Sequence, residues 1–380
     1  SVLLILDLGG IPLAARARRG NDPLVIGGGP VAFHPEPFAD FFDAFLIGDG
    51  EDLLPEFLEA WLTERRKKRC SRAAALARLQ RLPGVYVPVL RDAAKDAAPP
   101  KITRRVIASL QGAPAPAAPL VPIVQPIHDR LNLEIMRGCL HGCRFCQAGF
   151  LSRPRRERPP SEIVELAAAE LSRSGFEEIS LLSLSSSDYC AIDRLLGDLM
   201  LLTRNQRNLR LSLPSTRVDA LPERLLALFP DKKRGGFTLA PEAGSQRLRD
   251  VINKNVTTEE IIRTCSRVFA LGWRRVKLYF MIGLPTETDE DVAAIADLAD
   301  LIKKTAGKRG SVTCSVSAFV PKPHTPFQWA AQCGEAELER KFRLLEPRLR
   351  QAGVELRRHD PFSSVLELSL IHISEPTRLL

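Results

Sequence analysis

The sequence predicts an α/β protein in which short apolar strands alternate with amphipathic helices around a parallel sheet. Three observations predict this fold. The alternation continues from about residue 130 to residue 319. Hydrophobic residues make up 45% and charged residues 26% of the chain, as in globular proteins, and no apolar run has the ~18 residues needed to span a membrane. With 380 residues, the chain can also form two domains with separate cores.

Six strand–helix units are expected in this region. The strands are predicted at 131–136, 178–184, 209–213, 236–240, 275–282 and 312–319. The helices are predicted from about 161 and at 188–203, 222–229, 246–252, 258–271 and 289–304. Small, polar or conformationally special residues follow each strand. In βα barrels the active site lies at the carboxyl ends of the strands, so these loops are expected to form it.

The chain is expected to have five parts. Residues 1–63 form a small α/β module, and residues 64–126 form a linker with a helix at 65–82 and extended segments at 84–90 and 101–108. The barrel occupies 127–330, and a helix (335–351) and an edge strand (354–358) lie within 331–367. Residues 368–380 resemble a translated sequencing adapter and are set aside. We therefore expect the natural protein to continue beyond both ends.

Cysteines provide the strongest chemical signal. Cys139, Cys143 and Cys146 lie within eight residues, in a C-x3-C-x2-C pattern directly after the first predicted strand. Three thiolates can hold one metal centre but are one short of the four that close an ordinary iron–sulfur or structural zinc site. Zinc is disfavoured because a second cysteine pair is missing, and His141 between the cysteines is poorly placed to complete a tetrahedron. Reduced structural thiols are the remaining alternative.

This cysteine pattern resembles that of the radical S-adenosylmethionine (SAM) superfamily. The resemblance implies a partial (β/α)6 TIM-like barrel and a 4Fe–4S cluster bound by the three cysteines. The open iron of the cluster would chelate the amino and carboxylate groups of SAM. One electron, from a reductant such as a flavodoxin or ferredoxin, would then yield methionine and a 5′-deoxyadenosyl radical. A thiolate-ligated cluster suits the reducing cytoplasm.

The resemblance also implies further contacts with SAM. The implied residues are Phe145 and Gly283 near adenine, Ser185 and Ser186 near the amino group, and Arg217 and Glu242 near the ribose and carboxylate. Each has a structural alternative: core packing for Phe145, a helix cap for the serines, an ion pair between Arg217 and Glu242, and a turn at Gly283. Glu287 follows Gly283 at a spacing one residue longer than usual, and no cofactor role is assigned to it.

The first module resembles the Rossmann-like module of cobalamin-binding radical SAM proteins. An apolar strand runs into Gly27, Gly28 and Gly29, which would allow cobalamin to approach the backbone, although a tight turn is the alternative. The resemblance covers residues 2–358 and includes Phe41-Phe42-Asp43-Ala44-Phe45 and Gly244-Ser245-Gln246-Arg247. The Asp-x-His-x-x-Gly loop of such modules is missing from the sequence, and His34 is expected to be a loop residue.

Three functions are considered. The first is a radical SAM enzyme, with cobalamin for methyl transfer or rearrangement of an unknown substrate. The second is radical modification of tRNA or another RNA, because methylthiotransferases share the Pro-x-Pro-x-Thr-Pro pattern at 321–326. The net charge of +9 and the basic runs at 64–72 and 153–158 are compatible with RNA, although a solvated helix end or loop is the favoured explanation. The third is a non-catalytic cobalamin or iron–sulfur sensor, which the complete cysteine triplet disfavours. A membrane partner is not expected.

Overall fold

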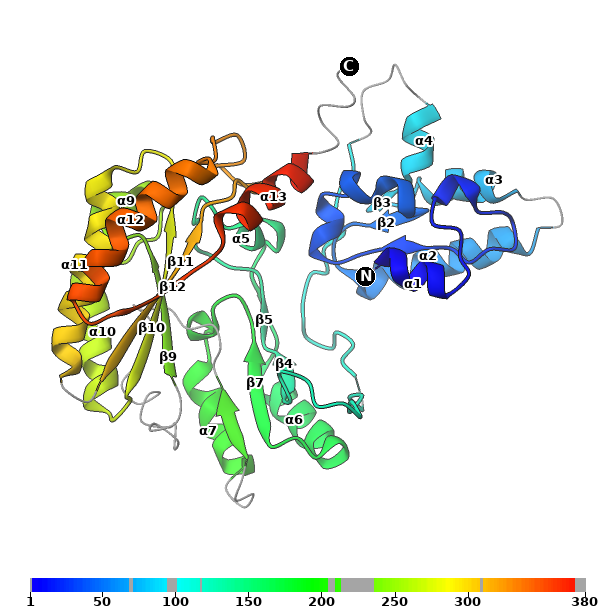
Figure 1. The fold of residues 1–380 in the computed structure, drawn as a ribbon. Helices are drawn as coiled ribbons and strands as arrows, with labels where there is room; N and C mark the ends of the chain where they lie inside the picture. The colour runs from blue at the N-terminus through cyan, green and yellow to red at the C-terminus, as the bar shows by residue number, and fades with distance from the viewer. Residues whose placement is uncertain are drawn as a thin grey trace. The chain divides into compact units, whose positions relative to one another are not determined.

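The computed structural model describes residues 2–67, 71–93, 101–116, 118–203, 209–212, 236–307 and 310–372. The chain divides into two compact units, one of residues 1–108 with 369–380 and one of residues 109–368 (Figure 1). Two calls fall outside the described residues: the helix predicted at 222–229 and the site residue Arg217.

The first unit contains a small three-stranded sheet. Strand β1 (Ile26–Gly27) pairs in parallel with β2 (Ala44–Leu46), which pairs antiparallel with β3 (Val85–Tyr86). Its helices are α1 (Val2–Leu8), α2 (Gly50–Arg65), α3 (Arg72–Leu79) and α4 (Pro88–Ala93), with 3-10 turns η1 (Ala15–Ala17), η2 (Pro30–Phe33) and η3 (Glu36–Phe41). Leu53 and Phe57 of α2 pack with Ala44 of β2 in its core.

The predicted helix at 65–82 is only partly correct. Helix α2 ends at Arg65, and a separate helix, α3, begins at Arg72. Ser71 determines that second start, because its side chain accepts a hydrogen bond from the Ala74 amide at the N-cap position. The extended segment predicted at 84–90 is only partly correct, since β3 is followed by α4, which begins at Pro88.

The second unit begins with a parallel sheet of three strands in the order β4-β7-β8. These strands are β4 (Leu131–Glu134), β7 (Glu178–Leu182) and β8 (Arg210–Ser212). The strand predicted at 131–136 stops at Glu134, and β5 (Met136–Arg137) pairs antiparallel with β6 (Arg156–Glu157) instead. Helices α5 (Gln147–Leu151), α6 (Pro160–Ser174) and α7 (Ile192–Thr203) and the 3-10 turn η4 (Ser186–Asp188) complete this part.

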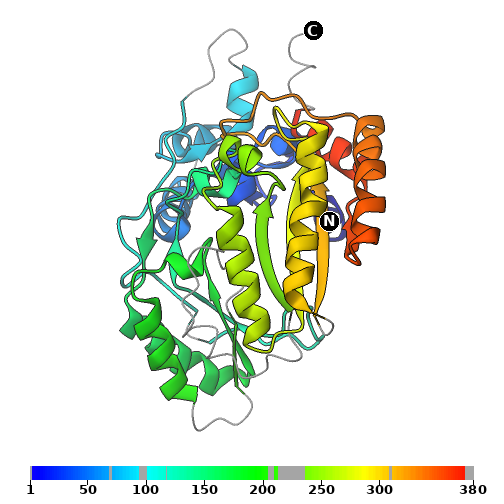
Figure 2. The same ribbon diagram turned by 90° about the vertical axis from the view of Figure 1, so that its left-hand side faces the viewer.

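A second parallel sheet has the order β12-β11-β10-β9. Its strands are β9 (Gly236–Glu242), β10 (Arg275–Ile282), β11 (Ser311–Ala318) and β12 (Glu355–Arg358). The helices are α9 (Gln246–Val251), α10 (Thr258–Ala270), α11 (Asp289–Ala306), α12 (Glu335–Gln351) and α13 (Pro361–His372). Figure 2 shows α10 and α11 across one face of this sheet. Alternate residues of β10, from Val276 to Ile282, are buried in the core beneath these helices.

The parallel arrangement and the edge position predicted for the strand at 354–358 are confirmed, because β12 pairs in parallel with β11. Both sheets run parallel, so the loops that follow their strands lie at the carboxyl ends, where the site was predicted. Among the described helices, none has the combination of length and apolar character that crossing a bilayer requires.

Candidate cluster and cofactor site

The cysteine loop joins β5 to α5. Cys139, Cys143 and Cys146 are all reduced, and Cys143 is buried. Cys146 is the N-cap of α5, and its Sγ accepts a hydrogen bond from the Gly149 amide at 3.4 Å. The loop begins at Gly138, whose φ of +92° is a backbone conformation that favours glycine.

The donor set, three thiols on one loop, fits a cuboidal iron–sulfur cluster. Burial raises the pKa of Cys146, and the nearby Cys139 raises it further, which shows that the two thiols are neighbours. Within the described parts of the chain, no three His, Cys, Asp or Glu side chains converge on a point where one ion could bind. A cuboidal cluster offers a different iron to each cysteine, so its ligands do not have to converge in that way.

Loops at three other strand or helix ends hold the cysteine loop in place. The polar contacts are His141 Nε2 to Asp188 Oδ2 at 2.7 Å, Asn253 Nδ2 to Gly142 O at 2.9 Å, and Gln147 Nε2 to Pro323 O at 3.2 Å. These partners follow β7, α9 and β11, respectively. The segments after β7 and β11 are among the loops that the sequence predicted to form the site, whereas the segment after α9 was not predicted.

Phe145 lies in an apolar cluster rather than in an open position. It packs against buried side chains from the segments that follow β9, β10 and β11: Ala243, Leu248, Ile252, Leu284 and Phe319. The structure therefore agrees with the alternative considered above, in which Phe145 packs in an apolar core. Its position beside Cys146 is compatible with a second role next to a bound cofactor, and that role stays a prediction.

The two predicted serines differ in their hydrogen bonding. Ser186 is fully buried, and its Oγ bonds to Ser183 Oγ at 2.8 Å and to the Leu181 carbonyl at 3.2 Å. Ser185 is only 2% exposed, yet its Oγ has no hydrogen-bond partner among the described residues. A buried hydroxyl without a partner costs free energy, so Ser185 fits a position that a bound ligand completes.

Glu242 lies at the end of β9 with a φ of +70°, a rare conformation for a residue with a side chain. Its carboxylate pairs with Lys254 at 3.3 Å, whereas Arg217, the partner considered from the sequence, lies outside the described residues. Burial raises the pKa of Glu242, although Lys254 opposes that shift. Both groups influence the pKa of Cys146, which places this pair beside the cysteine loop.

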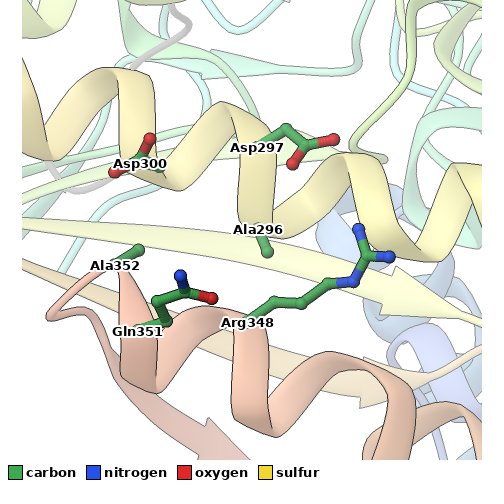
Figure 3. A pocket seen from close by; sticks show the side chains of 6 residues that line it. All are labelled: Ala296, Asp297, Asp300, Arg348, Gln351 and Ala352. Carbon is green, nitrogen blue, oxygen red and sulfur yellow. The ribbon is translucent and has the colours of Figure 1, made fainter.

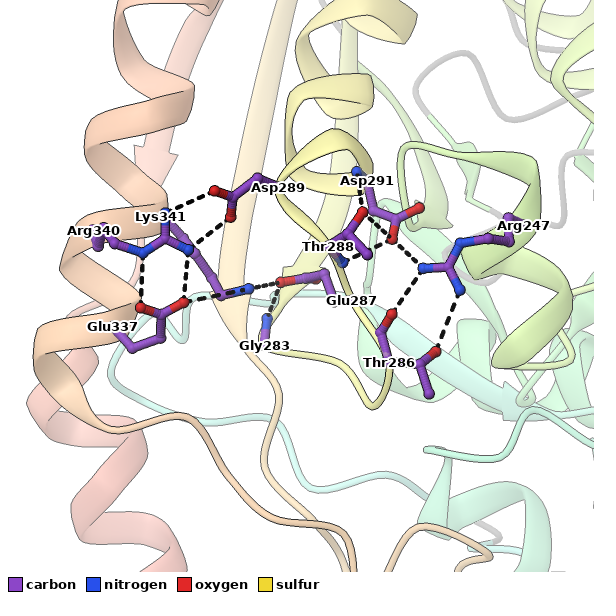
Figure 4. A network of polar contacts seen from close by, with 10 residues as sticks. All are labelled: Arg247, Gly283, Thr286, Glu287, Thr288, Asp289, Asp291, Glu337, Arg340 and Lys341. Atoms are coloured by element: carbon purple, nitrogen blue, oxygen red, sulfur yellow. Dashed lines mark hydrogen bonds and ion pairs between the residues drawn. The ribbon is translucent and has the colours of Figure 1, made fainter.

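Gly283 and Glu287 close the loop after β10. Gly283 has a φ of +80°, and its amide donates to Glu287 Oε1 at 2.7 Å (Figure 4). Lys341 pairs with the same oxygen at 2.8 Å. A Cβ at Gly283 would lie 3.2 Å from the Cys333 Sγ. Loop geometry and packing therefore account for this glycine, and its predicted contact with adenine is untested. Sequence reasoning gave Glu287 no role, but the carboxylate anchors this loop.

Asp291 stabilises the same region at the start of α11 (Figure 4). Its carboxylate accepts hydrogen bonds from Arg247, Ser245 and Thr288. Burial acts to raise the pKa of Asp291, but these donors outweigh it and lower the pKa to about 2.

This shift predicts a pH-dependent stability. Because the folded-state pKa of Asp291 lies below its ordinary value of 3.8, the ionised carboxylate stabilises the fold above about pH 4. That stabilisation, about 1–2 kcal/mol, should disappear as the pH falls towards about 2. Urea unfolding of the wild type and Asp291→Asn should differ at about pH 6, and the difference should fall to about half at about pH 3. An equal difference at both pH values would contradict the assignment.

The three glycines of the first unit are not equivalent. A Cβ at Gly27 would lie 2.7 Å from the Phe45 ring, so packing explains this glycine. A Cβ at Gly28 would have only the Leu46 carbonyl nearby, at 3.9 Å, and Gly29 has a φ of +79° and open space around it. His34, the expected loop residue, contacts the Ile371 carbonyl through Nε2 at 2.7 Å. A cobalamin role for the glycines stays a prediction.

One cavity lies away from the cysteine loop. Its volume is about 550 Å³, and the close view in Figure 3 shows it between α11 and α12. Its lining residues are Ala296, Asp297, Asp300, Arg348, Gln351 and Ala352. Because these residues belong to helices and not to the strand ends, the cavity is separate from the candidate site.

Comparison with known families identifies the class of protein. Residues 1–88 match the family described as "Radical SAM proteins, N-terminal", and residues 133–299 match the "Radical SAM superfamily". The chain therefore contains a radical SAM domain, as the cysteine pattern predicted. The chain is also 29% identical over 360 residues to "Uncharacterized protein MJ0966" of Methanocaldococcus jannaschii, covering 92% of this chain and 71% of that protein.

Solved structures identify the fold more closely. The chain is similar to the cobalamin-bound radical SAM methyltransferase TsrM of Kitasatospora setae, with a TM-score of 0.57, 15% identity and 81% of this chain covered. It is also similar to the cobalamin-dependent radical SAM enzyme OxsB, with a TM-score of 0.56, 13% identity and 93% covered. The chain spans 57% and 50% of these two proteins. The predicted partial TIM-like barrel with a Rossmann-like module is thereby confirmed.

A weaker similarity points to RNA-modifying enzymes. The tRNA-2-methylthio-N(6)-dimethylallyladenosine synthase of Coxiella burnetii is 26% identical over 178 residues, which cover 44% of this chain and 40% of the synthase.

Proposed function

We propose that this protein is an enzyme that cleaves SAM reductively, at a 4Fe–4S cluster bound by Cys139, Cys143 and Cys146. The observation that carries the proposal is the placement of the three reduced thiols on one loop. That loop is surrounded by segments that follow β7, α9 and β11. The radical SAM domain supports the same chemistry.

Cys139, Cys143 and Cys146 would hold the cluster, which, when bound and reduced, would supply the electron for cleavage of the C5′–S bond of SAM to methionine and a 5′-deoxyadenosyl radical. The protein's own residues bind and orient the substrate. Ser185 offers a buried hydroxyl that lacks a partner, and Glu242 offers a carboxylate held by Lys254. The apolar cluster around Phe145 excludes water from one side of the site.

Cobalamin is proposed as a second cofactor for methyl transfer or rearrangement. The fold shared with TsrM and OxsB supports it, since the descriptions of those two proteins name cobalamin. In the first unit, the open backbone at Gly29 is compatible with close approach of a bulky ligand. The chain's substrate would set the outcome of the radical reaction.

The proposed chemistry requires an electron donor, for which a flavodoxin or ferredoxin is the expected partner. It also requires a reducing compartment, and the cytoplasm is the expected location. RNA modification is the alternative function, favoured by the similarity to the tRNA-modifying synthase. If it is correct, the protein should bind tRNA with an affinity that falls steeply as salt increases.

Anaerobic reconstitution with iron, sulfide, a reductant and SAM tests the proposal. The expected result is 5′-deoxyadenosine. With cobalamin added, S-adenosylhomocysteine would indicate methyl transfer. A protein that binds the cluster and SAM but releases neither product would contradict the enzymatic proposal and favour a sensor.

Ser185→Ala should separate ligand binding from stability. Removing a hydroxyl that has no partner should leave the apoprotein as stable as the wild type or slightly more stable. It should weaken SAM binding to the reconstituted protein about 5-fold, the loss expected for one hydrogen bond of about 1 kcal/mol. Calorimetric titration measures that loss.

Ser186→Ala is the matched control, because Ser186 already has two hydrogen-bond partners. This variant should lower the free energy of unfolding by about 1 kcal/mol. If Ser185→Ala destabilises the apoprotein as much as Ser186→Ala does and leaves SAM binding unchanged, the proposed contact between Ser185 and SAM is wrong.

A further inference from the structure

Residues 249–256, here called the bracket, comprise the last residues of α9 and most of the segment between α9 and α10, and they contact the cysteine loop. We infer that Asn253 in the bracket is a positioning residue that holds the cysteine loop closed around its metal centre. The inference extends the proposed function, because it concerns the loop assigned to the cluster. It rests on contacts that involve neither SAM nor the substrate.

A buried arginine anchors the bracket. Arg249 is fully buried, and its guanidinium donates to the carbonyls of Ala243 and Gly244 at 3.0 and 2.7 Å. It also donates to the carbonyl of Val256 at 2.9 Å, at the other end of the bracket. One side chain thus ties the bracket to the segment that directly follows Glu242. A buried guanidinium is stable only when its donors are used, so this anchor fixes the backbone on both sides.

Asn253 reaches from this anchored segment to the cysteine loop. Its φ of +55° is left-handed, a conformation that asparagine adopts more readily than most residues. That conformation directs the side chain so that Nδ2 donates to the Gly142 carbonyl at 2.9 Å. A Cβ at Gly142 would lie 3.0 Å from the same Nδ2, which explains why glycine occupies this position.

Two further contacts lie beside the hydrogen bond of Asn253 and attach the bracket to the cysteine loop and to Glu242. The Arg144 amide donates to the Ile252 carbonyl at 3.0 Å. Lys254, the next residue after Asn253, pairs with Glu242 at 3.3 Å. The bracket therefore contacts the cysteine loop at Gly142 and Arg144, on both sides of Cys143, and contacts Glu242 through the adjacent residue. The side chain of Asn253 reaches the centre of that loop through its hydrogen bond to Gly142.

This geometry predicts that Asn253 controls access to Cys143. Cys143 is buried, with 8% of the residue exposed, while the loop is closed. Losing a hydrogen bond of about 1 kcal/mol should shift the loop towards an open state about 5-fold. The same shift should let the assembled cluster lose iron more rapidly.

The test compares Asn253→Gly with Asn255→Gly. Asn255 lies in the same turn with a φ of +48°, and its side chain is exposed. Glycine tolerates both conformations, so the two variants share any backbone effect and only the first removes the contact with Gly142. Iodoacetamide alkylation of the apoprotein, followed by peptide mass spectrometry, gives a rate for each cysteine.

Cys143 in Asn253→Gly should react about 5-fold faster than Cys143 in Asn255→Gly. Cys265 and Cys314, which are fully buried in the core, should stay equally protected in both variants and report on global unfolding. Equal rates at Cys143 would overturn the inference, as would a parallel increase at Cys265 and Cys314. Because the apoprotein is used, failure to cleave SAM would refute the proposed function without changing this result.

Discussion

Replacing Cys143 by alanine is expected to abolish the cluster and SAM cleavage. Cys143 is the central and most buried of the three thiols. With only two cysteines left on the loop, a cuboidal cluster lacks one of its protein ligands. Iron and sulfide analysis of the reconstituted variant should show less than half the wild-type content. The yield of 5′-deoxyadenosine should fall to background.

Cys190→Ala is the matched control for this prediction. Cys190 is exposed and lies after η4, outside the cysteine loop. Its replacement should leave iron content and SAM cleavage at wild-type levels. The ligand assignment is refuted if Cys143→Ala still turns over SAM, or if both variants lose the cluster equally.

The second large effect is expected for Gly138→Ala. Gly138 has a φ of +92°, which costs an L-residue about 1–2 kcal/mol. The added Cβ would also lie 2.6 Å from the Pro154 carbonyl oxygen and 2.8 Å from that of Ser152, both backbone atoms. The backbone before Cys139 must therefore move. We expect a loss of about 3 kcal/mol or more in the free energy of unfolding, together with poor cluster loading.

Gly175→Ala isolates the contribution of the backbone conformation. Gly175 has a φ of +71° after α6, but a Cβ there would meet no atom within 4 Å. This variant should lose about 1 kcal/mol and retain the cluster. Urea unfolding and iron analysis of both variants provide the measurements. Equal losses of stability would show that crowding at Gly138 is unimportant.

Much of the second unit was predictable from the pattern of apolar residues. Strand β10 (Arg275–Ile282) and helix α12 (Glu335–Gln351) have the predicted bounds, because alternating burial and helical periodicity are strong there. The helix at 65–82 failed because a local signal, the Ser71 cap, divides the apolar pattern. The short pairing of β5 with β6 depends on a partner twenty residues away and is invisible to local patterns.

The sequence predicted the candidate site only where the residues of a motif lie close together in the chain. The cysteine triplet could be recognised from sequence because its ligands are close in the chain. Ser185 and Ser186 looked equivalent, and only the fold shows that one of them lacks a partner. Asn253 and Lys254 were missed because their contacts, Gly142 and Glu242, are brought together by tertiary structure. The signal available in the sequence was the pair of asparagines at 253 and 255, because asparagine tolerates the left-handed conformation that both residues adopt.

Electron paramagnetic resonance of the reduced, reconstituted protein, recorded before and after adding SAM, tests the central claim most directly. The claim is that three cysteines bind an iron–sulfur cluster whose remaining iron accepts SAM. We predict a 4Fe–4S signal that changes when SAM is added. Protein that contains only zinc, or a cluster whose signal is identical with and without SAM, would contradict the claim.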